Sequence, residues 1–167
     1  MTVSGGEPLL QADFCVELLR LAKEKGIGTA IETAGNVPWE TFERALPYLD
    51  FVMYDMKVFD NDRHIAYTGV PNLRIKENLK RLAQTGKRVI VRTPVIVGVN
   101  ATEDEIGNIA AFLRDHVPSL DYYELLPYHK LGLSKVDHLG MDFGEEFEVP
   151  PKELMATLGA VAETYLP

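Results

Sequence analysis

Short apolar runs alternate with helical patterns along the whole chain, and this alternation limits the possible folds more than any other feature. The expected strands lie around Val3 and in the runs "IGTAIETAG", "DFVMYDMK", "RVIVRTPVIVG" and "YYELLPYH". Strands that are separated by helices pair in parallel through right-handed crossovers. We therefore expect one α/β domain over residues 1–167, either a doubly wound sheet or a βα barrel with too few strands to close.

The segments between these strands carry apolar stripes at helical spacing. In the segment 11–26, the expected buried stripe consists of Phe14, Leu18, Leu21 and Ala22. Further helices are expected at 39–46, 72–86 and 102–116, and after Pro150-Pro151. The helix at 102–116 begins with Thr102 and Glu105, whose spacing is that of a capping box, so its first residue is well defined.

Composition excludes several classes of function. The formal net charge is -8, which argues against a nucleic-acid binder, because such proteins rely on lysine and arginine to displace counterions. No apolar run is long enough to span a membrane and no secretory leader opens the chain, so we expect a cytoplasmic protein without a membrane partner. The one cysteine, Cys15, cannot by itself hold a structural zinc ion or an iron–sulfur cluster.

Polar residues end the expected strands, which is where both candidate architectures bind their ligands. In chain order these residues are Gly5-Gly6-Glu7, Glu32-Thr33, Asp55 with Lys57, Arg92, and Tyr128-His129. His129 is the best placed of the four histidines, since the other three are expected in loops or at helix ends. We therefore expect the functional site at the carboxyl edge of the sheet.

Two of these groups have more than one reading. Asp55 and Lys57 point to one side of an extended chain, where they either form an ion pair or hold a zwitterionic ligand. Arg92 lies inside an otherwise buried run, so it needs a carboxylate partner or an anionic ligand. The possible carboxylate partners are Glu7, Glu32 and Asp55.

At this level of detail the chain resembles a known family. The segments "TVSGGEPLLQ", "IETAG", "YDMK", "RTPVIVGVN", "ELLPYHKLGLSK" and "VPPKELM", in this order, are similar to those of radical S-adenosylmethionine (SAM) activating enzymes of glycyl-radical enzymes, especially the pyruvate formate-lyase type. The resemblance implies a partial parallel βα barrel of the radical SAM type. It also implies a [4Fe-4S] cluster on a CxxxCxxC loop upstream of the "SGGE" turn.

The resemblance assigns S-adenosylmethionine-binding roles to individual residues. Gly5, Gly6 and Glu7 correspond to the turn that meets the amino group of the methionine moiety. The family's "DxK" element corresponds to Asp55 and Lys57, with Glu32 and Thr33 close by, and this chain has "ETAG" where many relatives have "DTNG". His129 corresponds to a histidine near the ribose or its adenosyl product. Arg92, whose buried charge needs a partner, is added to the expected cofactor-binding residues on that ground and not from the resemblance.

The reaction that the resemblance implies is reductive cleavage of S-adenosylmethionine to a 5′-deoxyadenosyl radical. This radical takes a hydrogen atom from a glycine of a partner glycyl-radical enzyme, and an electron donor such as flavodoxin supplies the electron. The chain has no CxxxCxxC motif, so we expect no catalytic residue and no metal ligand in it. We expect a carboxyl-terminal part of an activating enzyme that lacks the first strand-helix unit, is inactive alone, and dimerises through the edge strand at Val3.

Two alternatives remain open at this stage. The chain could be a non-catalytic interaction module that keeps the surface for the glycyl-radical partner. It could also be an aldolase-like βα enzyme in which Lys57 forms a Schiff base with a carbonyl substrate, although the adjacent Asp55 favours the charged ammonium. Which glycyl-radical enzyme is activated does not follow from these motifs.

Overall fold

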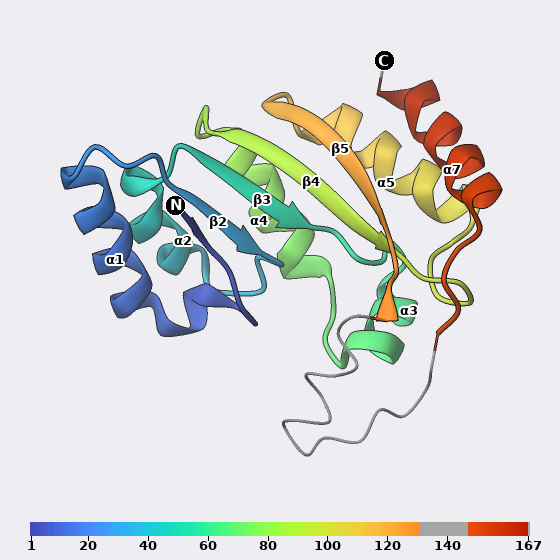
Figure 1. The fold of residues 1–167 in the computed structure, drawn as a ribbon, viewed down its shortest axis with the longest axis horizontal. Coiled ribbons are helices and arrows are strands. Elements are labelled where there is room, and N and C mark those ends of the chain that lie inside the picture. Colours follow the sequence, from blue (N-terminus) through green and yellow to red (C-terminus); the bar gives the residue numbers. More distant parts are fainter. Residues whose placement is uncertain (131–146, 167) are drawn as a thin grey trace.

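The computed structural model describes residues 1–130 and 147–166. Its centre is one parallel sheet of five strands in the order β1-β2-β3-β4-β5 (Figure 1). The strands are β1 (Thr2–Val3), β2 (Ala30–Thr33), β3 (Phe51–Asp55), β4 (Arg88–Val95) and β5 (Leu120–Pro127). All five strand regions expected from the sequence are therefore confirmed.

The order of the strands decides between the two candidate architectures. Each strand pairs in parallel with the next one along the chain, and the order never reverses. Right-handed crossovers between such sequential neighbours put every connecting helix on the same face of the sheet. The fold is thus the expected partial βα barrel and not a doubly wound sheet. On the second face, which we call the open face, residues 1–130 and 147–166 form no helix layer.

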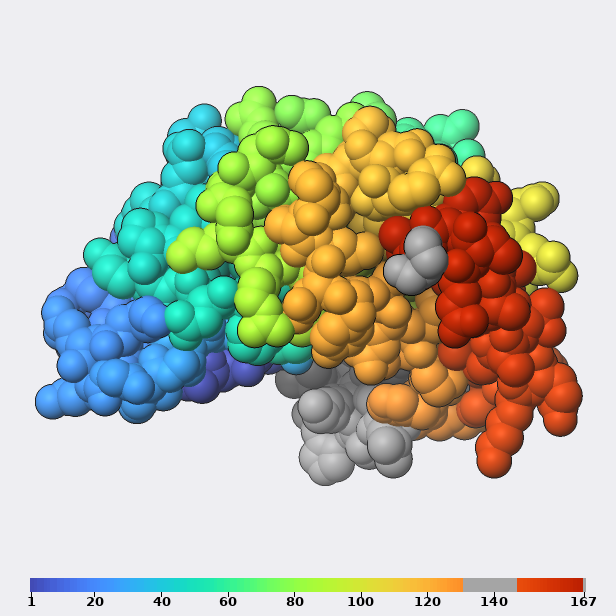
Figure 2. Space-filling model, turned by 90° about the horizontal axis from the view of Figure 1, so that it is seen from above, coloured from blue at the N-terminus to red at the C-terminus, as the bar shows by residue number. Residues whose placement is uncertain are grey.

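The helices follow the strands as the alternation predicts. They are α1 (Ala12–Glu24), α2 (Trp39–Ala45), α3 (Asn61–Thr68), α4 (Leu73–Ala83), α5 (Glu103–His116) and α7 (Lys152–Tyr165), with short 3-10 helices η1 (Pro8–Gln11) and η2 (Leu46–Tyr48). Helix α7 lies beside β5 at the surface (Figure 2). Among the described helices, none has the length and apolar character that crossing a bilayer requires.

Helix α3 is absent from the sequence prediction. The Asp60 side chain caps its first turn by accepting from the Arg63 amide at 2.8 Å, and Gly69 ends it with a left-handed φ of 76°. Both are ordinary helix boundary signals. Apolar periodicity does not indicate this helix, because the segment between these two boundaries is mostly polar and has no long apolar stripe.

The buried face of α1 also differs from the prediction. Cys15, Leu19 and Ala22 face the core, whereas Phe14 is 69% exposed and Leu21 is 44% exposed. Positions 15, 19 and 22 also follow helical spacing, so apolar periodicity alone cannot choose between the two neighbouring stripes. The prediction is thus confirmed at Ala22, wrong at Phe14 and Leu21, and Leu18 is half-buried.

The predicted capping box at α5 forms only in half. Thr102 Oγ1 accepts from the Glu105 amide at 3.3 Å, as expected. The Glu105 carboxylate does not return to Thr102, however; it is buried and accepts a hydrogen bond from the backbone N–H of Phe59. Glu105 therefore fixes the segment that follows β3, and this segment belongs to the functional site described below.

Candidate functional site

Arg92 of β4 lies on the open face between two carboxylates. Its guanidinium nitrogens are 3.0 Å from Asp55 Oδ1 on β3 and 3.2 Å from Glu32 Oε1 on β2, and its side chain is 15% exposed. Asp55 is the register partner of Arg92, so the two side chains leave the sheet on the same face. The expectation that Arg92 needs a carboxylate partner is confirmed with two partners at once.

The charges of this cluster support one another. Burial alone would lower the pKa of Arg92, but hydrogen bonds and charges from Glu32 and Asp55 outweigh it, and the pKa is raised. The pKa of Glu32 is lowered, first by a hydrogen bond from Ser4 Oγ at 2.6 Å and then, against the effect of burial, by Arg92. Both groups are therefore charged at neutral pH, and Ser4 links the turn after β1 to the cluster.

Glu7, the third candidate partner of Arg92, has a different role. Its carboxylate accepts from Thr33 Oγ1 at 2.7 and 2.8 Å and from the Ala34 amide at 3.1 Å. A longer hydrogen bond of 3.4 Å from the Leu9 amide caps η1. Most of the acceptor capacity of Glu7 is thus used to tie the turn after β1 to the end of β2.

Glycine is required at two turns beside the site. Gly5 has a φ of 135°, a conformation that residues with a Cβ rarely adopt. Gly35 has a φ of 70°, and a Cβ built on it would lie 1.8 Å from the hydroxyl oxygen of buried Tyr54. The turn after β2 is held further by Asn78 of α4, whose Nδ2 donates to the Gly35 carbonyl at 2.8 Å. The loops at the carboxyl ends of β1 and β2 are therefore well fixed.

A cleft of ≈ 300 Å³ lies where β1, β2 and β3 end. Its lining includes Gly6, Glu7, Asp55, Lys57 and His64. Lys57 forms no ion pair with Asp55 or any other described residue, whereas Asp55 Oδ1 is paired with Arg92. The simple reading of Asp55 and Lys57 as an ion pair is thus wrong, and Lys57 leaves its ammonium available to a ligand.

The other predicted site residues do not line this cleft. Arg92 is connected to the cleft by its ion pair with Asp55, and Glu32 by its ion pair with Arg92. Thr33 is buried, and its hydroxyl donates to Glu7, which lines the cleft. His129 follows β5, is exposed, and does not line the cleft. His138 lies outside the described residues. The sequence analysis did not predict a role for His64, which it placed in a loop or at a helix end. The residue is buried within α3, and the helix boundaries at Asp60 and Gly69 could have indicated this.

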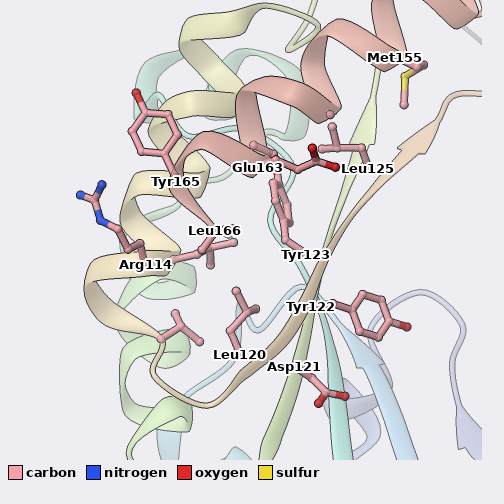
Figure 3. A pocket seen from close by; sticks show the side chains of 14 residues that line it. Arg114, Leu120, Asp121, Tyr122, Tyr123, Leu125, Met155, Glu163, Tyr165 and Leu166 are labelled. Atoms are coloured by element: carbon pink, nitrogen blue, oxygen red, sulfur yellow. The ribbon is translucent and has the colours of Figure 1, made fainter.

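A larger cavity than this cleft lies elsewhere in the described part of the chain. A groove of ≈ 670 Å³ runs between β5, the end of α5 and α7, and is lined by residues such as Leu120, Tyr123, Met155 and Leu166 (Figure 3). None of the predicted site residues reaches it. Its mostly apolar lining belongs to the helix layer, so it does not share the chemistry of the cleft.

The residues of this chain do not fit an iron–sulfur cluster. Cys15 is the one cysteine of the sequence, and it is buried in the core under α1. Burial, followed by the charge of Glu7, raises the pKa of its thiol, which disfavours the thiolate that a metal needs. No group of three or more histidine, cysteine or acidic side chains among the described residues could hold a metal ion.

Comparison with known proteins places this chain in a family. The sequence model of the Radical SAM superfamily matches residues 1–113. The isethionate sulfite-lyase activating enzyme of Desulfovibrio desulfuricans is 46% identical over 144 residues, which are 85% of this chain and 46% of that protein. The choline trimethylamine-lyase activating enzyme of Oleidesulfovibrio alaskensis is 40% identical over 86% of this chain and 47% of its own length.

A solved structure matches the whole fold. A domain of pyruvate-formate lyase-activating enzyme from Bacteroides vulgatus superposes with a TM-score of 0.84 and 28% identity, over 99% of this chain and 93% of that one. The chain spans about half the length of the curated relatives that it matches. With the superfamily match over residues 1–113 and relatives that activate glycyl-radical enzymes, the chain belongs to the radical SAM superfamily.

Proposed function

We propose that this chain is the S-adenosylmethionine-binding part of an activating enzyme that installs a glycyl radical on a partner enzyme. The observation that carries the proposal is the pair of unlike charges in the cleft, Asp55 held by Arg92 and Lys57 without an ion-pair partner among the described residues. The methionine moiety of S-adenosylmethionine carries a carboxylate and an ammonium. Lys57 would bind the carboxylate, and Asp55 with the carbonyls of the Gly5-Gly6 turn would accept from the ammonium.

The surrounding contacts would orient the cofactor. Glu7 and Thr33 hold the glycine turn, and Glu105 holds the segment after β3, so the groups that bind the methionine moiety are fixed before it enters. In this family the electron for cleavage comes from a reduced [4Fe-4S] cluster, which the residues of this chain do not fit. We therefore assign binding and orientation of the cofactor to this chain, and not the cleavage itself.

The partner is proposed at the level of its class. The relatives' names include activating enzymes of isethionate sulfite-lyase and choline trimethylamine-lyase, and the matching structure is from a pyruvate-formate lyase activator. Pyruvate formate-lyase and isethionate sulfite-lyase are accordingly the first glycyl-radical partners to test. A flavodoxin-type electron donor and a cytoplasmic location belong to the same proposal. Membership of the radical SAM superfamily does not favour the interaction module or the Schiff-base aldolase.

Ligand binding to the 167-residue chain tests the proposal. We expect S-adenosylmethionine to bind measurably by equilibrium dialysis, and the Lys57→Met variant to bind about tenfold more weakly, because a hydrogen bond to a charged group is lost. Lys25→Met is the matched control, since Lys25 is exposed after α1 and far from the cleft lining. Equal affinity of the Lys57→Met variant and the unmodified chain would contradict the role of Lys57.

A further inference from the structure

His64 of α3 lines the cleft, although none of the roles proposed above uses it. The residue is 3% exposed. Its Nδ1 is 2.7 Å from the Val70 carbonyl oxygen and 2.9 Å from Thr68 Oγ1. The Thr68 hydroxyl in turn donates to the His64 carbonyl at 2.7 Å. The ring is therefore held from one side by the end of its own helix.

These contacts assign the proton on the ring. A carbonyl oxygen can only accept, so Nδ1 of His64 carries the hydrogen that Val70 receives. The Thr68 hydroxyl has given its hydrogen to the His64 carbonyl, so its oxygen is free to accept from the same Nδ1–H. In the neutral imidazole, Nε2 then has a lone pair and acts as a hydrogen-bond acceptor.

That lone pair has access to the cleft. Nε2 has no hydrogen-bond partner among the described residues. In the same part of the chain, the buried polar side-chain atoms that lack a partner are Asn72 Oδ1 and Ser119 Oγ, and Nε2 is not one of them. Because Nε2 is neither partnered nor fully buried, and His64 lines the cleft, it can be reached by a ligand there.

We propose that His64 Nε2 accepts a hydrogen bond from the ammonium of the methionine moiety and so positions S-adenosylmethionine. This inference rests on the proposed function. An ammonium has three N–H donors, and part of the carboxylate oxygens near the cleft are in use, because Glu7 accepts from Thr33 and Ala34 and Asp55 Oδ1 accepts from Arg92. Asp55 Oδ2 and the glycine carbonyls remain for two of the donors. Nε2 of His64 supplies a further acceptor for the third donor without adding another negative charge to the cleft that Glu7 and Asp55 line.

Two substitutions test the roles of the two ring nitrogens of His64 separately. In His64→Asn the amide nitrogen takes the place of Nδ1 and still donates toward Val70, while the acceptor is removed. In His64→Gln the amide oxygen reaches the position of Nε2 and restores an acceptor. The ligands are S-adenosylhomocysteine, which has the amino-acid moiety, and 5′-methylthioadenosine, which has the same adenosyl group without it.

We expect His64→Asn to weaken binding of S-adenosylhomocysteine about tenfold and to leave 5′-methylthioadenosine unchanged, with partial recovery in His64→Gln. Equal weakening of both ligands would overturn the proposal, because it would indicate a contact to the adenosyl group or a general structural role. Unchanged binding of S-adenosylhomocysteine to His64→Asn would overturn it as well. If the unmodified chain binds neither ligand, the proposed function fails and the role of His64 fails with it.

NMR spectroscopy determines directly which ring nitrogen of His64 carries the hydrogen. A two-bond ¹H–¹⁵N spectrum of the unmodified chain, with His64 identified by its absence from the His64→Asn spectrum, should have the pattern of a neutral ring protonated at Nδ1. Addition of S-adenosylhomocysteine should shift the Nε2 signal, and 5′-methylthioadenosine should not. A ring protonated at Nε2 would overturn the proposal, because that nitrogen would then donate and could not accept from an ammonium.

Discussion

At the scale of single residues, Ser4 and Glu32 connect the first turn to the charge cluster. The pKa of Glu32 is lower in the folded chain than in the unfolded chain, where it is about 4.3. The stability that ionised Glu32 contributes is therefore fully present above the unfolded pKa and is lost as the pH falls through the folded pKa. Ser4→Ala should therefore cost about 0.5–1 kcal/mol near pH 7, a small figure because the partly exposed pair is screened. Below about pH 4 the cost should shrink.

Urea unfolding at pH 7 and pH 3.5 measures this difference in the free energy of unfolding. The same substitution in a Glu32→Gln background is the control, since the amide does not titrate and the effect of Ser4→Ala should then be independent of pH. An effect of Ser4→Ala that is equally large at both pH values would show that the hydrogen bond to the charged form of Glu32 is not its source.

Gly35 is a residue that tolerates no side chain. Gly35→Ala combines a left-handed φ of 70° with a Cβ that would lie 1.8 Å from the Tyr54 hydroxyl oxygen, which donates to the Ile75 carbonyl. Gly26→Ala is a matched control, because Gly26 has the same φ of 70° with nothing within 4 Å of its Cβ.

The control should lose about 1–2 kcal/mol of unfolding free energy from the backbone alone. Gly35→Ala should lose at least about 2 kcal/mol more, because Tyr54 must move within a packed core. Urea denaturation of the two variants beside the unmodified chain measures both losses. Similar losses in the two variants would mean that the space around Gly35 opens easily.

At the scale of elements, sequence patterns predicted what depends on local chemistry. The five strands were predictable because each is a short apolar run with polar residues at its end, and parallel pairing then brought Glu32, Asp55 and Arg92 to one edge. What could not be predicted depends on packing. The buried stripe of α1 could not be predicted without knowing how the helix packs on the sheet. The hydrogen bond between Glu105 and Phe59 could not be predicted because it joins segments that are 46 residues apart in the sequence.

Helix α7 carries an interior glycine that packing does not require. Gly159 has nothing within 4 Å of its Cβ position and lines the groove beside β5. Gly159→Ala should raise the free energy of unfolding by about 0.5–1 kcal/mol, because alanine loses less backbone entropy in a helix. The neighbouring Ala160→Gly should lower it by a similar amount, and the double variant should be close to neutral. A loss of stability in Gly159→Ala would contradict an open position.

At the scale of the whole molecule, β1 and α1 lie at one end of the fold and α7 lies at the other (Figure 1). Among the described strands, the two-residue β1 pairs with β2 alone, so its other edge is free of these strands. Next to it, Leu10 is 76% exposed and Phe14 is 69% exposed. A free strand edge beside an apolar surface is a common setting for self-association. Dimerisation through this edge remains a prediction, and the surface expected to take part consists of β1, Leu10 and Phe14.

Sedimentation velocity over a range of protein concentrations tests this prediction. The unmodified chain should shift from monomer toward dimer as its concentration rises, and Phe14→Lys should weaken the association at least about tenfold by placing a charge in the apolar contact. Leu73→Lys is the matched control, because Leu73 of α4 is also exposed but lies away from β1. A monodisperse monomer at high concentration would contradict the prediction, and equal weakening by both variants would place the contact elsewhere than at α1.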